Sequence, residues 1–240
     1  MHYLDLVFAD PARNLACDEA ILDFCEFNAG DQEILRLWEP ANYFIVVGYS
    51  NRTSLEVDID ACKTRAIPIF RRFSGGGAVL QGPGCLNYTL VIKNERPGYL
   101  GDVPNAYRRV LQRHRGIFQG LISEAVQIEG ISDLAVAGQK FSGNAQHRKR
   151  VYTMFHGTFL LNFDLALMEA CLRMPSKQPS YRQSRSHQSF LRNLLIDSSE
   201  VRSALREEWQ AKGRLRDFPH QQIEALLERR YARNEWNHRY

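Results

Sequence analysis

The sequence contains few cysteines and no long hydrophobic run, and each absence narrows what the protein can be. Its five cysteines are scattered and form no CxxC pair, so neither a disulfide framework nor a zinc site is indicated. The apolar runs are only as long as a β-strand, so no membrane-spanning helix is expected. The first residues include acidic side chains and lack a basic region before an apolar segment, which argues against a secretory signal and favours a cytoplasmic protein.

A strong excess of charge is also lacking. The formal net charge is +4, which is too small to indicate nucleic-acid binding by itself. Basic residues gather locally instead, at Arg71 and Arg72 and in the segments 139–150 and 181–187. These segments could converge on one acidic ligand, and solvated surface charge is the competing interpretation for each of them.

The chain shows no internal repeat and no long Pro/Ser linker, so its 240 residues are expected to form one domain, 1–240. Strand-like segments occur at 34–39, 43–49, 66–71, 86–92, 133–138 and 151–163. Helical patterns occupy 10–27, 102–122 and 198–212. Because many strands follow one another without intervening helices, the pattern predicts the α+β class with a mixed or antiparallel sheet, not a doubly wound fold.

The segment RRFSGGGAVL, residues 71–80, places three glycines between two arginines and an apolar strand. It lacks the Gly-Lys-Ser/Thr of a Walker A loop and the GxGxxG spacing of a dinucleotide fold. Successive glycine N–H groups can hold an anion or let a ligand lie against the backbone, and Arg72 could neutralise a phosphate or carboxylate. A glycine-rich turn or bulge is the competing interpretation.

A second group of residues lies at 133–150. Asp133 begins a short predicted strand, and Lys140 follows a predicted turn at Gly138. A loop of small residues is expected directly after the lysine, formed by Ser142, Gly143, Asn144 and Ala145. A carboxylate, an ammonium group and a glycine loop suit an ATP-dependent acyl-activation site, since Mg²⁺ takes oxygen ligands and a lysine acts as a point charge on phosphate. A surface β-hairpin that carries a lysine is the alternative.

Three segments together resemble the signature segments of the lipoate–protein ligase A family. They are 71–79 (RRFSGGGAV), 133–146 (with GQKFSGNAQ at its end) and 156–164 (HGTFLLNFD), in the same order and at similar separations. Weaker similarity occurs at 10–21, 46–58 and 230–237, so the resemblance covers nearly the whole chain.

This resemblance implies a fold like the catalytic core of class II aminoacyl-tRNA synthetases and biotin ligases, with a large mixed sheet, a smaller sheet and flanking helices. It implies ATP-dependent attachment of lipoate or octanoate, through lipoyl-AMP or its octanoyl equivalent and with Mg²⁺, to a lysine of a lipoyl acceptor. The acceptor would be the glycine-cleavage H protein or a 2-oxoacid dehydrogenase E2 domain. No nucleic acid or membrane partner is implied.

The resemblance also assigns roles to residues. Lys140 matches the lysine that contacts the acyl carbonyl and the adenylate phosphate, and Asp133 matches the aspartate near Mg²⁺. The substrate-binding positions it implies are Arg72, Ser74, Gly75, Gly76, Gly77, Ser142, Gly143, Asn144, Ala145, His156 and Gly157. Gly48 and residues of 86–92 are candidate walls for the acyl chain. The sequence departs from the family at Gln81, where a histidine is frequent, and at Ser132, where an asparagine commonly stands.

Two other functions stay open. An octanoyltransferase of the same fold would take octanoate from acyl carrier protein through a cysteine thioester. Its nucleophile is expected in 126–132, which contains no cysteine here, so Cys85 and Cys171 are the remaining candidate thiols. A non-catalytic lipoate-binding protein would keep the pocket without turnover. Many relatives carry an accessory domain after the catalytic core, and the sequence ends at Tyr240, so we expect either a separate accessory subunit or a compact ligase.

The segment 176–194 carries three arginines without a recognisable motif. Arg182, Arg185 and Arg192 could meet an acidic acceptor surface or lie on a solvated face, and the solvated face is the interpretation we favour. Tyr181 and His187 are expected to pack or cap.

Overall fold

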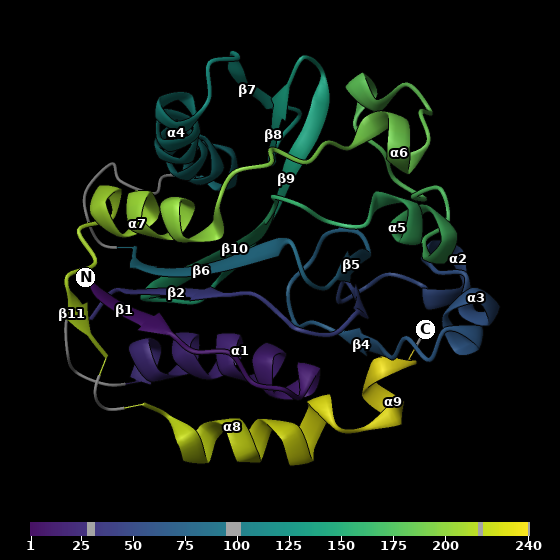
Figure 1. The fold of residues 1–240 in the computed structure, drawn as a ribbon. Helices are drawn as coiled ribbons and strands as arrows, with labels where there is room; N and C mark the ends of the chain where they lie inside the picture. Colours follow the sequence, from purple (N-terminus) through teal and green to yellow (C-terminus); the bar gives the residue numbers. More distant parts are fainter. Residues whose placement is uncertain (28–31, 95–101, 216–217, 240) are drawn as a thin grey trace.

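The computed structural model describes residues 1–27, 32–94, 102–215 and 218–239, which build two β-sheets flanked by helices (Figure 1). The large sheet has the order β11-β1-β2-β6-β10-β9-β8-β7, and the small sheet has the order β4-β3-β5. The large sheet contains β1 (His2–Asp5), β2 (Ile34–Trp38), β6 (Cys85–Lys93), β7 (Val126–Glu129), β8 (Asp133–Val136), β9 (Gln139–Arg148), β10 (Tyr152–Leu160) and β11 (Gly213–Arg214). The small sheet contains β3 (Phe44–Val47), β4 (Ile69–Arg71) and β5 (Val79–Gln81).

Helices cover both faces of the large sheet, which explains why its central strand β6 is buried almost throughout. On one face lie α1 (Pro11–Phe27) and α8 (His220–Leu226); on the other lie α4 (Val103–Leu121) and α7 (Ser198–Glu208) (Figure 1). Neighbouring residues of one strand enter opposite cores, because side chains alternate between the faces of a sheet: Val91 packs with α1, and Ile92 packs with α4.

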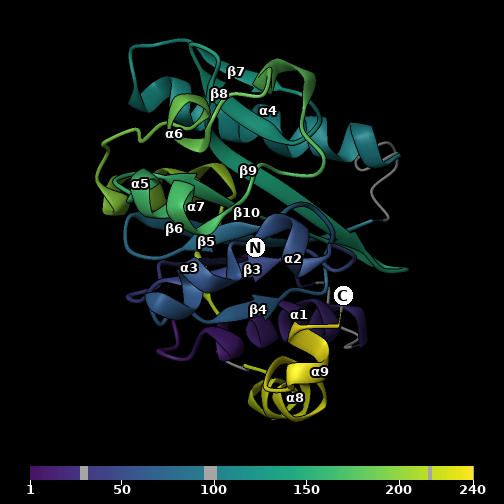
Figure 2. The same ribbon diagram turned by 90° about the vertical axis from the view of Figure 1, so that its right-hand side faces the viewer.

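The small sheet packs beside the large one and is covered by short helices: α2 (Thr53–Glu56), α3 (Ile59–Thr64), α5 (Leu165–Cys171) and α6 (His187–Phe190) (Figure 2). A 3₁₀ turn, η1 (Ser180–Arg182), lies between α5 and α6. A π-helical turn, η2 (Leu227–Tyr231), and α9 (Asn234–Asn237) follow α8. Among the described residues, no helix combines the length and the apolar character needed to cross a membrane.

The α+β class, with a large mixed sheet and a smaller one, is confirmed. Every predicted strand and long helix is present, most of them with shorter bounds, whereas β6 extends one residue further at each end. The strands β1, β7, β9 and β11 were not predicted. The expected loop at 142–145 is wrong, because these residues lie in β9 and pair with both β8 and β10. The turn lies before them, where Ala137 and Gly138 have φ values of 50° and 73°. The small residues of β9 therefore lie inside the sheet, where there is little space for a larger side chain, and do not form a turn.

Candidate active site

A cavity of about 250 Å³ lies between the two sheets, α1 and the segment 168–191. One wall is apolar, with Leu15, Trp38, Val46 and Val79 from α1, β2, β3 and β5. Another part of the lining comes from the segment after β10 and carries the basic side chains Lys177, Arg182 and His187. All predicted site residues line this cavity except Ser74 and Gly75. The fold therefore brings together residues from segments that are far apart in the chain.

Lys140 and Asp133 form an ion pair on the β8–β9 hairpin. The Lys140 Nζ lies 2.9 Å from Asp133 Oδ1, and the second carboxylate oxygen, Oδ2, accepts a hydrogen bond of 2.8 Å from the Tyr181 hydroxyl. Gly143 pairs directly with Asp133 across the two strands. A methyl group at Gly143 would lie 2.7 Å from Lys140 Nζ, so this glycine leaves the space that the ammonium group occupies.

Residues 72–77, which we call the glycine loop, are held by the Arg72 guanidinium. Its Nη2 donates to Gly75 O at 2.7 Å and to Gly77 O at 2.8 Å, and its Nη1 donates to Val46 O at 3.3 Å. Burial lowers the pKa of Arg72 to about 10, so the side chain stays charged at neutral pH. Most of its donors are thus committed to backbone carbonyls, and a direct contact with a ligand stays a prediction.

The three glycines of this loop have different structural requirements. Gly76 has a φ of 94°, and a methyl group there would lie 2.7 Å from Arg72 Nη2. Gly75 and Gly77 have open space where a methyl group would be, and Gly77 lines the cavity. Gly48 packs against Gly76 O so tightly that no side chain fits, and it does not line the cavity, so its predicted role as an acyl wall is wrong. Only Gly76 is therefore required by the conformation of the loop itself.

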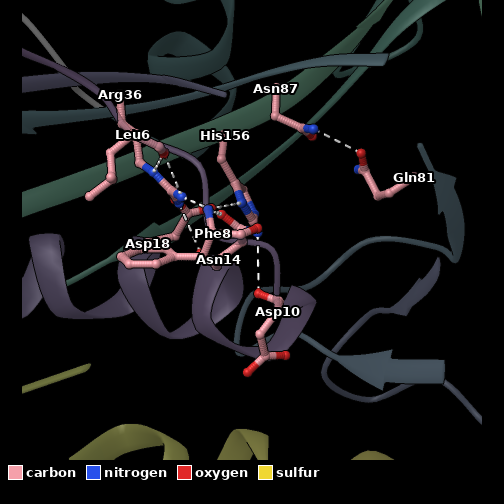
Figure 3. A network of polar contacts seen from close by, with 9 residues as sticks. All are labelled: Leu6, Phe8, Asp10, Asn14, Asp18, Arg36, Gln81, Asn87 and His156. Atoms are coloured by element: carbon pink, nitrogen blue, oxygen red, sulfur yellow. Dashed lines mark hydrogen bonds and ion pairs between the residues drawn. The ribbon is translucent and has the colours of Figure 1, made fainter. Parts of the chain in front are cut away.

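A buried polar network that includes Asp18, Arg36 and His156 lies at the cavity, and Asp18 and His156 belong to the cavity lining (Figure 3). Arg36 Nη1 donates to Asp18 Oδ1 at 2.6 Å, and His156 Nδ1 lies 3.8 Å from Asp18 Oδ2. On its other side, His156 Nε2 lies 2.6 Å from Ser74 Oγ. Burial would raise the pKa of Asp18, but the Arg36 guanidinium and His156 outweigh it and lower this pKa. Burial lowers the pKa of His156, which favours a neutral ring. The network thus fixes His156 between α1 and the glycine loop.

Sequence reasoning missed Asp18 and Arg36. Arg36 is the centre of the otherwise apolar strand ILRLW, and Asp18 lies in a helix whose neighbouring residues are buried. A charged residue in the middle of an apolar strand indicates a buried partner, because burying an unpaired charge is costly. That signal was present at Arg36, but it does not identify the partner.

Asn144 and Gly157 are paired residues on β9 and β10. Asn144 Oδ1 accepts from the Tyr88 hydroxyl at 2.6 Å, and its Nδ2 donates to Ser132 O at 2.7 Å. A side chain at Gly157 would overlap Asn144 Oδ1, so glycine is required beside this amide. Gln81, one of the departures from the family, accepts from Asn87 Nδ2 at 2.9 Å in the cavity wall (Figure 3).

The five cysteines are free and buried, and none of them lines the cavity. Burial raises the pKa of Cys85 to about 12 and also raises the pKa of Cys171. A nucleophilic cysteine must form a thiolate and reach its substrate. The geometry therefore gives no support to Cys85 or Cys171 as an acyl-carrying thiol.

The arginines of residues 176–194, which we call the wall segment, were expected on a solvated face, and this expectation is wrong for Arg182. Arg182 is 4% exposed, lines the cavity and lies over the Phe190 ring at 4.8 Å. The prediction missed it because the segment has no regular period, whereas three tertiary contacts hold it to the β8–β9 hairpin. They are Tyr181 with Asp133, Arg185 with Gly138 O, and the Arg192 N–H with Lys140 O. Arg192 itself is half-buried and pairs with Glu124.

Comparison with known proteins gives a consistent result. The family model described as the lipoyl protein ligase A/B catalytic domain matches residues 10–210. A probable lipoate-protein ligase A of Mycoplasma pneumoniae is 30% identical over 165 residues, which cover 68% of this chain and 46% of that protein. That match thus spans less than half of the Mycoplasma protein. An octanoyltransferase LipM of Brevibacillus brevis is 27% identical and covers 95% of this chain and 94% of its own.

Solved structures give the same fold. An archaeal bi-partite lipoate protein ligase from Thermoplasma acidophilum superimposes with a TM-score of 0.84 at 24% identity, covering 99% of this chain and 95% of that one. A lipoate-protein ligase A bound with ATP has a TM-score of 0.79 at 25% identity, covering 99% and 98%.

Proposed function

Since the chain belongs to the lipoyl protein ligase A/B catalytic domain family, we propose that it uses ATP to activate lipoate or octanoate and attaches the acyl group to a lysine of a lipoyl acceptor protein. One observation carries the proposal: the Lys140–Asp133 pair lines a cavity whose other wall is apolar. Such a cavity suits a molecule with a polar head and a hydrocarbon tail. The similarity to a lipoate-protein ligase A bound with ATP supports the nucleotide.

The chemistry needs activation because a free carboxylate is a poor acyl donor. The carboxylate oxygen attacks the α-phosphorus of ATP, pyrophosphate leaves, and an acyl-adenylate forms. The deprotonated lysine amine of the acceptor then attacks the acyl carbonyl, AMP leaves, and the amine loses a proton. Lys140 places a positive charge where charge develops in both steps. The apolar wall orients the tail, and holding two reactants in line supplies roughly 7–11 kcal/mol in favourable cases.

The residues present fit a role for Mg²⁺ with one protein carboxylate. No group of three or more His, Cys, Asp or Glu side chains that could hold a metal occurs among the described residues. Mg²⁺ at nucleotide sites commonly uses one or two carboxylates together with phosphate oxygens, and Asp133 is the candidate. When bound, the ion would neutralise phosphate charge.

The partners follow from the proposal. The acceptor is a lipoyl domain of the E2 type or the glycine-cleavage H protein, in the cytoplasm. A similar Thermoplasma protein is named lipoate-protein ligase A subunit 1, and the archaeal ligase of the same fold is bi-partite. These relatives support a separate accessory subunit that acts with this chain.

An octanoyltransferase is the second candidate, because LipM proteins match this chain over nearly its whole length. It would need no ATP. The buried cysteines weigh against a thioester intermediate on this chain, since each is outside the cavity lining.

The test is the intact mass of an apo lipoyl domain after incubation with the protein. Lipoate or octanoate is supplied with and without ATP and Mg²⁺, and octanoyl carrier protein is supplied alone in a parallel reaction. We expect an acyl mass increase that requires ATP, either with this chain alone or after addition of an accessory subunit. An octanoyl adduct from the carrier protein alone, with no ATP-dependent product, would replace the ligase by the transferase.

A further inference from the structure

Arg182 is a buried cation without a complete set of partners. Its Nε donates to Arg185 O at 3.0 Å, whereas its Nη2 is buried and has no hydrogen-bond partner. No ion pair joins it to a carboxylate in the part of the chain that the structure describes. Buried polar groups are nearly always paired, so an unpaired guanidinium nitrogen beside a cavity needs an explanation.

The position of Arg182 is fixed by its neighbours. The guanidinium lies over the Phe190 ring, and Arg185 bonds back to Arg182 O and Tyr181 O. The Tyr181 hydroxyl is bonded to Asp133, which already pairs with Lys140. These contacts hold the arginine in place before any ligand binds, so little side-chain entropy is lost when it meets one.

Two other buried arginines, Arg36 and Arg72, have more hydrogen-bond partners than Arg182. Arg36 is paired with Asp18 and bonded to Leu6 O and Asn14, and Arg72 is bonded to three carbonyls. Burial lowers the pKa of Arg182, and the nearby Glu169 and Asp133 carboxylates offset this only in part. An anion in the cavity would offset the remaining cost of burial, because charge-assisted hydrogen bonds are strongest where water is excluded.

We propose that Arg182 binds an oxygen of the nucleotide α-phosphate, and thereby distinguishes an adenylate from an unphosphorylated nucleoside. The inference rests on the proposed function. A guanidinium matches the geometry of phosphate oxygens, whereas Lys140 supplies a point charge from the β8–β9 hairpin. The α-phosphate fits better than the leaving pyrophosphate, because the residue is 4% exposed and the pyrophosphate must depart to solvent.

The test measures binding and needs no turnover. Isothermal titration calorimetry with AMP and with adenosine is carried out on the wild type, Arg182→Gln, Arg182→Lys and the control Arg192→Gln, and ATP is also titrated into the wild type. The control substitution Arg192→Gln also removes a guanidinium charge, but at a residue outside the cavity lining. We expect the wild type to bind AMP more tightly than adenosine. In Arg182→Gln the AMP affinity should fall about 10- to 100-fold, the size expected for one charge-assisted hydrogen bond, with adenosine affinity unchanged.

The other variants complete the design. Arg182→Lys should recover part of the AMP affinity, and Arg192→Gln should match the wild type. Arg182→Gln should resist urea at least as well as the wild type, because it removes a buried charge that the nearby carboxylates offset only in part. Equal AMP affinity in wild type and Arg182→Gln would overturn the inference and leave the ligase proposal standing. A wild type that binds neither AMP nor ATP would overturn the ligase proposal, and this inference with it.

Discussion

Arg72 in the glycine loop and Arg182 in the wall segment face the same cavity, yet the protein uses them differently. Arg72 donates to the carbonyls of Val46, Gly75 and Gly77, so its charge organises the backbone around the cavity. Arg182 keeps an Nη2 without a partner, although it is equally buried. The comparison teaches that burial and charge do not define the role of an arginine. What separates a structural cation from one available to a ligand is the number of its donors that the protein already satisfies.

Lys140→Ala should have the largest effect, because it removes a charge that is available to the reacting groups. Acyl-adenylate formation should fall at least about 10²- to 10³-fold, the loss typical of removing one transition-state contact. The free energy of unfolding should also fall, because the Asp133 carboxylate, whose side chain is 8% exposed, loses its charged partner and keeps the Tyr181 hydroxyl. Rates of hydroxamate formation from octanoate, ATP and hydroxylamine measure this. Exposed Lys63→Ala is the control, and acyl activation by Lys140→Ala at the rate of that control would remove Lys140 from the site.

Arg72→Met should mainly reduce stability. It leaves the buried carbonyl of Val46 and the exposed carbonyls of Gly75 and Gly77 without their donor, and one buried unpaired group costs about 1–3 kcal/mol. We therefore expect a loss of about 1–3 kcal/mol in urea unfolding, against little loss or a gain for Arg182→Met. If both variants unfold at the same urea concentration, the distinction between the two arginines does not hold.

Within the glycine loop, Gly76→Ala and Gly77→Ala should separate conformation from ligand contact. Gly76→Ala imposes a φ of 94° on a residue with a side chain and crowds Arg72, so stability should fall by about 1–3 kcal/mol. Gly77→Ala should fold like the wild type and bind acyl-adenylate more weakly, because its methyl group enters open space at the cavity. Gly75→Ala is the control, since Gly75 does not line the cavity. Parallel urea unfolding and ligand titrations measure both effects, and normal stability of Gly76→Ala would contradict the assignment.

The smallest effect concerns His114, a buried group outside the cavity lining with one unpaired ring nitrogen. Its Nε2 accepts from Trp209 Nε1 at 3.1 Å, its Nδ1 has no partner, and burial lowers its pKa to about 3. Below about pH 6.5 the His114 imidazole is protonated in the unfolded state, whereas in the folded state it stays neutral until the pH approaches 3. Stability from this group is therefore full above that pH and falls toward pH 3, by up to about 1.4 kcal/mol per pH unit.

The measurement for His114 compares urea unfolding of the wild type and His114→Gln at pH 7 and pH 5.5. The difference in stability between the two proteins should shrink by about 1 kcal/mol at the lower pH. AMP affinity should be unchanged, because this residue does not line the cavity. A constant difference at both pH values would show that His114 titrates normally.

The sequence predicted the fold class and most strands because apolar alternation and turn residues are local signals. The motifs at Lys140, Asp133 and the glycine loop could also be recognised, since each is local in sequence, and the fold places Lys140, Asp133, Arg72, Gly76 and Gly77 around one cavity. Their roles as site residues stay predictions. Strand β9 was missed because its glycine and asparagine have low strand propensity, whereas pairing on both sides holds them in the sheet.

The position of Arg182 could not be predicted, because it depends on contacts between the wall segment and the β8–β9 hairpin about 50 residues earlier in the chain. The same holds for Asp18 and Arg36, whose pairing joins α1 to β2. Local sequence shows that a charge is present. It does not show which atoms satisfy it.

The most direct test of the account is the exchange of labelled pyrophosphate into ATP in the presence of lipoate or octanoate. The exchange is measured with this chain alone and with an accessory subunit. Exchange reports reversible formation of the acyl-adenylate without any acceptor protein. The account predicts exchange that requires lipoate or octanoate and is lost in Lys140→Ala. Absence of exchange with either acid under both conditions, together with octanoyl transfer from carrier protein without ATP, would contradict it.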